Sequence, residues 1–145
     1  MPPRHWLVKS DPETFSIDDL ERSPGKTTTW DGVRNYQARN YLRDEMKVGD
    51  RVLFYHSQED KAVLGTATVT RAGHPDATDR EADPGSPTWY AVDLKLDRRF
   101  RRPVTLDEMR KTGGLADMVL LKKGSRLSVQ PVTASEWKIV EKLGG

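Results

Sequence analysis

The sequence predicts an α+β domain in which a curved, mostly antiparallel sheet or small barrel is surrounded by short helices. Three observations support this fold class. Segments 51–57, 62–70 and 88–96 are rich in apolar and β-branched residues, as strands are. Helix-capping signals lie between and after these segments. The order of the two kinds of element is neither a regular βαβ alternation nor all-β.

The first third of the chain begins with a predicted strand at residues 5–9, which ends before Pro12 because the residue preceding a proline disfavours helical geometry. A short capped helix at 16–20 and a brief extended segment at 27–30 follow. We expect Asn35 to cap a helix over 36–46. Three residues spaced four apart form its buried stripe: Ala38, Leu42 and Met46.

The middle of the chain predicts a hairpin. Residues 51–57 are apolar on both faces, as in a central strand, and 62–70 form its partner. In that partner, one face would carry Val63, Gly65, Ala67 and Val69. A loop rich in proline and acidic residues at 73–87, expected to be mobile, precedes the strand at 88–96.

The last third predicts a short helix beginning at Thr105 and a final strand at 125–132. Pro131 lacks the N–H that a central strand must donate, so we expect this strand at an edge of the sheet. Thr133 and Glu136 have capping-box spacing and open a C-terminal helix to about residue 141.

The composition excludes several classes of function. The 145 residues suit one domain, 1–145, and the net charge of +2 neither requires nor excludes nucleic acid. The chain has no cysteine, and its three histidines (His5, His56 and His74) lack helical metal-motif spacing, so we expect no metal and no cofactor. No apolar run reaches membrane-span length, and residues near Met1 do not form the apolar region that a signal peptide would need. We therefore expect a cytoplasmic monomer without a membrane partner.

The segment 29–36, Thr-Trp-Asp-Gly-Val-Arg-Asn-Tyr, is too polar for a core and unusually aromatic for a loop. Two interpretations fit it. Trp30 and its neighbours could form one wall of a small-ligand pocket, with Gly32 allowing a sharp turn or a close backbone approach. Alternatively, Trp30 could be a buried structural residue beside the helix that Asn35 caps.

Signals of catalysis are weak. His56 and Ser57 are neighbours on a predicted strand, so their side chains point to opposite faces and cannot pair directly as base and nucleophile. The chain has no nucleophile elbow, no P-loop and no dinucleotide fingerprint. The sequence therefore favours a binding module over an enzyme. A hydrolase with His56 as general base remains the lesser alternative.

Small polar side chains lie on or at the ends of the predicted strands, where they could read the edge of a planar ligand by hydrogen bonds. They are Ser10, Ser57, Ser128 and Gln130. Trp30, Tyr36 and Tyr55 could supply stacking surfaces. The alternative is that the serines bond to neighbouring backbone groups and that Tyr55 belongs to the core.

A basic cluster surrounds Phe100 and consists of Arg98, Arg99, Arg101 and Arg102. Guanidinium groups suit bidentate phosphate contacts, so the cluster is a candidate phosphate-binding surface. It could equally be a solvated hairpin edge, where charge discourages pairing with other sheets.

Several blocks together resemble one family. They include Trp-Leu-Val-Lys-Ser-Asp-Pro at 6–12, Trp-Asp-Gly-Val-Arg-Asn-Tyr-Gln-Ala-Arg-Asn at 30–40 and Arg-Leu-Ser-Val-Gln-Pro-Val at 126–132. From about Arg4 to Val140 the chain resembles the EVE domain proteins of the PUA-like group. Asp11 departs from the family, which usually has Glu before this proline.

The resemblance implies a PUA-like pseudo-barrel and a fold similar to the YTH and SRA domains, which bind methylated bases. It implies a non-catalytic module that recognises a modified base, such as methylated or hydroxymethylated cytosine or N6-methyladenine, in DNA or RNA. A nucleoside- or nucleotide-binding protein is the alternative. Carried over to this sequence, the base pocket would contain Lys9, Ser10, Trp30, Val33, Arg34, Asn35, Tyr55, His56, Ser57, Ser128 and Gln130.

Overall fold

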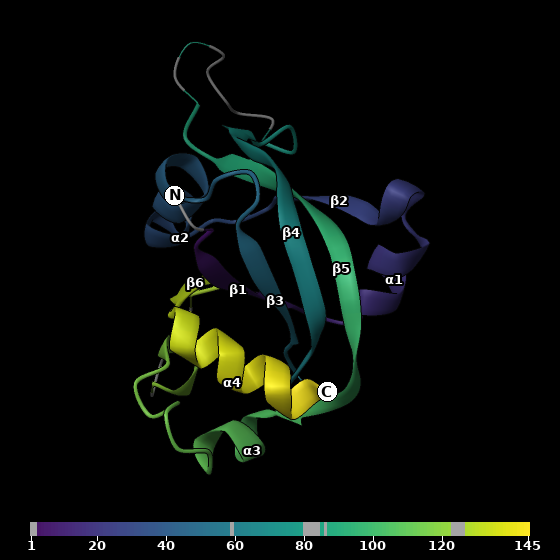
Figure 1. Cartoon of the computed structure of the whole chain (residues 1–145). Coiled ribbons are helices and arrows are strands. Elements are labelled where there is room, and N and C mark those ends of the chain that lie inside the picture. Colours follow the sequence, from purple (N-terminus) through teal and green to yellow (C-terminus); the bar gives the residue numbers. More distant parts are fainter. Residues whose placement is uncertain (1–2, 59, 80–84, 86, 123–126) are drawn as a thin grey trace.

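The fold is built on one six-stranded sheet, seen in Figure 1. The computed structural model describes residues 3–58, 60–79, 85, 87–122 and 127–145. Its strands are β1 His5–Ser10, β2 Thr27–Trp30, β3 Arg51–His56, β4 Ala62–Pro75, β5 Tyr90–Thr105 and β6 Val129–Val132. Part of the predicted 73–87 loop and the start of the predicted 125–132 strand lie outside the described residues.

The sheet order is β2-β5-β4-β3-β1-β6. β1 and β3 pair in parallel, and the other neighbouring strands pair antiparallel, which confirms the mostly antiparallel sheet. Within the described part of the chain, β2 and β6 are the two edges and no ladder joins them. The sheet is therefore open, which is the first of the two forms expected. Pro131 lies in the edge strand β6, as predicted.

The helices begin where the capping residues predict. They are α1 Ile17–Arg22, α2 Tyr36–Asn40, α3 Leu106–Arg110 and α4 Ala134–Gly144, with short turns η1 Pro24–Lys26 and η3 Val119–Leu121. Ser16 and Thr133 form capping boxes, and Asn35 and Thr105 each accept one backbone N–H. The predicted helix over 36–46 consists of α2 and a π-helical turn, η2 Tyr41–Glu45, and its stripe of Ala38, Leu42 and Met46 is buried.

Two hydrophobic cores lie on opposite faces of the sheet. The first core contains Trp6 and Phe54 and is covered by residues of α1, α2 and η2. The second contains Leu7 and Trp137 and includes residues of α3 and α4. Figure 1 shows α4 across the lower part of the sheet and α3 below it. Strand residues alternate between the two cores because successive side chains point to opposite faces.

A bulge in β4 corrects one expectation about its faces. Tyr55 of β3 pairs with Val63 and Phe54 pairs with Gly65, so β4 has one extra residue against β3 at this point. Val63 therefore lies in the second core and Ala67 in the first. An extra residue at a bulge changes which face the following side chains occupy. The prediction that Val63 and Ala67 share a face was therefore wrong.

Candidate functional site

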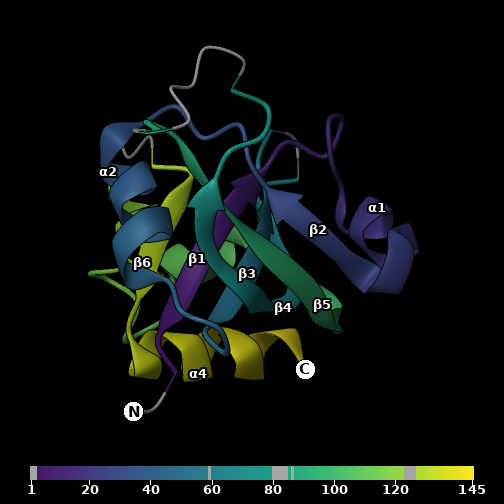
Figure 2. The same ribbon diagram turned by 90° about the horizontal axis from the view of Figure 1, so that it is seen from above.

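A pocket of about 440 Å³ lies where the end of β1 meets the end of β2. Figure 2 shows the two strands converging near the centre of the molecule, with α1 to one side. The lining residues are Lys9, Ser10, Asp11, Thr14, Phe15, Thr28, Thr29, Trp30 and Asp31. Of the predicted pocket residues, the structure brings together Lys9, Ser10 and Trp30 at this position.

Trp30 and Phe15 form the aromatic part of the pocket. The indole of Trp30 stands edge-on against the ring of Phe54, with centroids 5.9 Å apart and planes at 80°. Phe15 packs against the same ring at 6.5 Å. Edge-to-face contacts of this kind hold aromatic rings in fixed orientations. Trp30 is partly exposed, so part of its surface remains free to contact a ligand.

The polar wall is formed by Lys9 and Ser10 at the end of β1. The Ser10 hydroxyl donates to the Phe15 carbonyl and closes the loop that follows the strand. The Lys9 backbone N–H donates to the Ser128 carbonyl at 2.9 Å, which fixes β1 beside the segment leading into β6. Burial lowers the pKa of the Lys9 ammonium below its usual range, because desolvation disfavours the charged form.

His56 lies beneath the pocket as a buried structural residue. Its Nε2 accepts the Ile17 backbone N–H at 2.9 Å, and its Nδ1 lies 2.9 Å from an Asp60 carboxylate oxygen. Because Nε2 accepts, the ring proton is on Nδ1, which donates to Asp60. His56 therefore fixes the first turn of α1, and both ring nitrogens are engaged.

Asp31 forms the rim of the pocket beside a buried carboxylate. Burial raises the pKa of the Asp31 carboxyl, and the negative charge of Asp76 raises it further. Gly32, at φ +75°, turns the chain so that its N–H donates to Asp76 at 2.8 Å. Arg34 donates to the same carboxylate oxygen at 3.0 Å.

The side chain of Asp76 is fully buried. Burial by itself would raise its pKa. Hydrogen bonds from Thr78, Gly32 and Arg34 outweigh that effect and lower the pKa of Asp76 to about 2. Asp76 is therefore an ionised anchor for the turn that follows Trp30.

The other residues expected from segment 30–36 support the pocket from behind. Val33 belongs to the first core, and Asn35 accepts the Ala38 N–H at 3.0 Å to cap α2. Arg34 is half-exposed and held by Asp76. The structure places all three next to the wall that Trp30 and Asp31 form, without placing them in the lining.

Four further predicted residues lie around the pocket or away from it. Tyr55 lies in the second core, on the opposite face of the sheet, and burial raises the pKa of its phenol. The Ser57 hydroxyl donates to the Ser10 carbonyl at 3.2 Å, and the Gln130 amide donates to the Leu127 carbonyl at 2.8 Å. Ser128 contributes the carbonyl that accepts from Lys9. The alternative interpretation, backbone bonding by the serine hydroxyls and a core position for Tyr55, describes Ser10, Ser57 and Tyr55.

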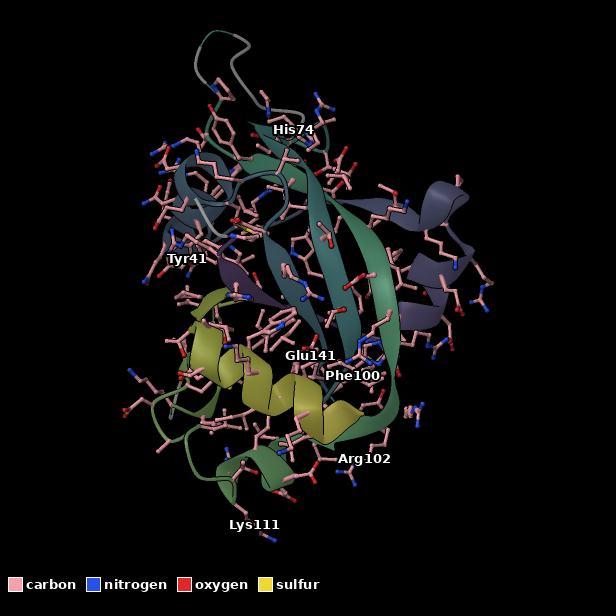
Figure 3. The ribbon with its side chains drawn as sticks, viewed as in Figure 1. Tyr41, His74, Phe100, Arg102, Lys111 and Glu141 are labelled. Atoms are coloured by element: carbon pink, nitrogen blue, oxygen red, sulfur yellow. The ribbon has the colours of Figure 1, made fainter. Side chains whose placement is uncertain are left out.

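The basic cluster lies at the far end of β5. Figure 3 shows Phe100 and Arg102 beside α4, at the opposite end of the molecule from His74. Arg99 pairs with Asp18 at 2.6 Å and Glu21 at 3.0 Å, while Arg98 and Arg102 donate to carbonyls of the C-terminal residues Gly145 and Leu143. Arg101 is exposed. Phosphate binding by these four residues stays a prediction.

The list of base-pocket residues did not include six of the lining residues, which are Asp11, Thr14, Phe15, Thr28, Thr29 and Asp31. Thr29 and Asp31 nevertheless belong to the segment 29–36 that was interpreted as a pocket wall. Asp31 had a usable signal, since it directly follows Trp30 in the aromatic segment. Phe15 had none, because a single aromatic residue in a loop is compatible with any buried position. Among the described residues, no group of three or more acidic or histidine side chains could hold a metal ion.

Comparison with known proteins identifies the family of this chain. The sequence pattern of the EVE domain matches residues 4–143. The chain belongs to the EVE domain family. Human thymocyte nuclear protein 1 is 40% identical over 163 residues, an alignment covering 94% of this EVE domain protein and 72% of the relative.

Solved structures of similar proteins share the fold along almost the whole chain. A crystal structure of a protein from Pseudomonas putida has a TM-score of 0.90 at 41% identity, covering 97% of this chain and 99% of the other. A crystal structure of the human THYN1 protein in complex with 5-methylcytosine-containing DNA has a TM-score of 0.88 at 37% identity, covering 97% of each chain. In the part of this EVE domain that the structure describes, no helix is long and apolar enough to cross a membrane.

Proposed function

We propose that this EVE domain binds a modified base of a nucleic acid in the pocket between β1 and β2, and that 5-methylcytosine in DNA is the first candidate. The pocket supports the proposal because it combines an aromatic wall with polar groups from two strand ends. Its volume of about 440 Å³ is that of a small-ligand site. The THYN1 complex with 5-methylcytosine-containing DNA supports the choice of ligand, since the two chains share 37% of their residues.

Trp30 and Asp31 have separate roles in this proposal. The Trp30 indole stacks on the base, an interaction worth about 1–3 kcal/mol per base in single-strand binders. The Asp31 carboxylate accepts a hydrogen bond from the exocyclic amino group that cytosine carries and thymine lacks. Phe15 offers apolar surface for a methyl group.

A base inside a duplex must be extruded before it can enter such a pocket. Extrusion costs a few kcal/mol, so a duplex binds less tightly than a single strand unless backbone contacts offset that cost. A free nucleoside would occupy the same pocket without phosphate contacts. The salt dependence of binding distinguishes a polymer from a free nucleoside. For a polymer, log affinity falls linearly with log salt concentration, and the slope is proportional to the number of phosphates that the protein neutralises.

The hydrolase alternative depends on His56 as general base. That role requires a free lone pair on the ring, and the lone pair of Nε2 accepts the Ile17 N–H. The contacts of His56 support a structural role instead.

The test is a fluorescence-anisotropy titration with one single-stranded DNA sequence that carries cytosine, 5-methylcytosine or thymine at its central position. We expect the 5-methylcytosine strand to bind most tightly. Replacing Trp30 with Ala should weaken that binding by about 5- to 100-fold, the equivalent of one lost stacking contact. Asp31→Asn should reduce the preference for 5-methylcytosine over thymine. Asp107→Asn, which changes an exposed carboxylate of α3 outside the lining, is the matched control and should leave the three affinities unchanged.

Circular dichroism establishes that each variant is folded. If Trp30→Ala is folded and its affinity for the 5-methylcytosine strand is unchanged, the pocket is not the binding site. Equal affinity for all three strands would leave a nucleic-acid binder without base recognition.

A further inference from the structure

Four side chains beside the pocket are stacked in a row, which we call the arginine–aromatic stack: Arg34, Trp89, Tyr36 and Arg39. The Arg34 guanidinium lies 5.2 Å from the centre of the Trp89 ring. The Trp89 and Tyr36 rings are 5.0 Å apart and inclined by 30°. The Arg39 guanidinium then lies 5.1 Å from the Tyr36 ring. Each of the two rings therefore has a guanidinium about 5 Å from its centre.

The stack is unusually exposed for its composition. Tyr36 is 62% exposed, and it is one of the two exposed large hydrophobic side chains among the described residues. The Arg39 guanidinium donates to the Thr88 carbonyl at 2.7 Å and to the Asn40 side-chain oxygen at 2.8 Å. Both acceptors are uncharged, so these bonds orient the guanidinium without neutralising it. The hydrophobic cores include neither Tyr36 nor Trp89.

The stack is joined to the pocket by a short anchored segment. Asp31 lines the pocket, and the next residue, Gly32, is bonded to Asp76 together with Arg34. Asn35 then caps α2, which carries Tyr36 and Arg39. In Figure 2 this segment runs from the end of β2 to the start of α2. The stack is thus held at a fixed position relative to the pocket.

We infer that the arginine–aromatic stack binds the nucleotides that flank the base in the pocket. A flanking base packs against the exposed surface of Tyr36, and Arg39 contacts a phosphate of the same strand. Exposed aromatic rings interleaved with arginine are the surface that single-stranded nucleic acids favour, because every base has a π-face and every linkage a negative charge. The inference rests on the proposed function and narrows its ligand to a strand rather than a free nucleoside.

The test compares Tyr36→Ala and Arg39→Gln with two controls elsewhere on the surface. Val48 is 64% exposed and apolar, so Val48→Ala is the control for Tyr36→Ala. The Arg22 side chain is 73% exposed and lies on α1, so Arg22→Gln removes the same charge at a distance. Binding is measured by anisotropy, at several salt concentrations, to single-stranded DNA with a central cytosine or 5-methylcytosine.

Tyr36→Ala should weaken binding to both strands by about 5- to 100-fold and leave the ratio of the two affinities unchanged. Arg39→Gln should reduce the slope of log affinity against log salt by about 0.7, the value for one phosphate contact on a single strand. The two control variants should bind as the unchanged protein does. Thermal unfolding verifies that all four variants are folded.

The outcomes separate this inference from the proposed function. Unchanged binding by folded Tyr36→Ala would overturn the role of the stack, and a preference for 5-methylcytosine would still support the pocket. Loss of the preference for 5-methylcytosine in Tyr36→Ala would also overturn the inferred role of the stack, since Tyr36 would then contact the base in the pocket. If the unchanged protein binds both strands equally and Tyr36→Ala weakens that binding, the role of the stack is supported and base recognition by the pocket is rejected. Absence of binding to either strand would overturn both.

Discussion

Asp76 shows how one buried charge can organise a binding site that it does not line. Its carboxylate accepts from the Gly32 backbone, from the Arg34 guanidinium and from Thr78. Each of these donors favours the ionised form, and removing the charge leaves them without a strong acceptor in a buried position. The turn that follows Trp30 therefore depends on a single ionised group.

That dependence predicts a change in stability at acid pH. The pKa of Asp76 is about 2 in the folded protein and near 3.8 when the chain is unfolded. A lowered folded-state pKa stabilises the protein above pH 3.8, and the stabilisation is lost as the pH falls through 2. The shift corresponds to about 2 kcal/mol in the free energy of unfolding.

Urea unfolding of the unchanged protein and of Asp76→Asn, at several pH values between 5 and 2, measures this effect. We expect the difference in unfolding free energy between the two proteins to narrow by about 2 kcal/mol over that range. Carboxylates that Asp76 does not influence titrate alike in both proteins and cancel in the difference. Asp31, whose pKa the charge of Asp76 raises, is the exception. A difference that stays constant with pH would show that the charge of Asp76 does not stabilise the fold.

Individual residues differ in how far the sequence could place them. Ser10 and Trp30 were predicted for the pocket because a polar strand end and an aromatic residue beside a turn are local signals. Tyr55 lies in β3, which is buried on both faces, so the strand pattern could not decide which core its ring enters. Asp76 is far from Gly32 in sequence, and such pairings have no local signal.

At the level of elements, the backbones of η2 and β4 are in close contact at their junction. The Met46 N–H donates to the Tyr41 carbonyl, five residues earlier, at 2.9 Å. A bond over five residues, in place of the four of an α-helix, defines the π-helical turn. Gly73 of β4 lies against this turn. A methyl group on Gly73 would overlap the Leu42 carbonyl oxygen and lie 3.0 Å from the Arg43 Cα atom.

Gly73→Ala should therefore lower the free energy of unfolding by about 1–3 kcal/mol, the usual cost of overpacking. Gly113→Ala is the control, since a methyl group there would meet nothing within 4 Å. Chemical denaturation of both variants gives the comparison. Equal stability of the two would mean that β4 and η2 can separate at little cost.

The same junction marks the limit of predicting elements from this sequence. The start of the helix at Asn35 and its buried stripe were predicted, because a cap and a spacing of four are local patterns. The π-helical turn contains no proline or glycine that would predict it from the sequence. It lies against β4, a contact that local patterns do not show. The bulge after Val63 likewise depends on pairing with another strand, β3, and has no local signal.

For the whole molecule, one sheet serves two cores. Consecutive residues of β3 contribute to different cores: Leu53 to the second and Phe54 to the first. If the strands separate in one core, the sheet that supports the other core is disrupted as well. We therefore expect the cores to unfold together in a single transition, as in most domains of this size.

Two variants test this expectation. Trp6 belongs to the first core, Trp30 packs against it, and Trp137 belongs to the second core. Trp137→Phe therefore removes the tryptophan of the second core, and the double variant Trp6→Phe/Trp30→Phe removes both tryptophans of the first. In urea, the fluorescence midpoint of each variant should coincide with its own circular-dichroism midpoint. Separate midpoints would show that one core unfolds before the other.

The convergence of β2 with the middle of the sheet has a further consequence. β2 and β3 are separated by β5 and β4, which in a flat sheet would hold them about 14 Å apart. The Trp30 and Phe54 rings are nevertheless 5.9 Å apart, because the sheet coils and long side chains bridge the remaining gap. The coiling of the sheet thus sets the width of the pocket. Its bulges between β4 and β5 are places where evolution or design can adapt this scaffold to larger or smaller guests without altering any residue that touches them.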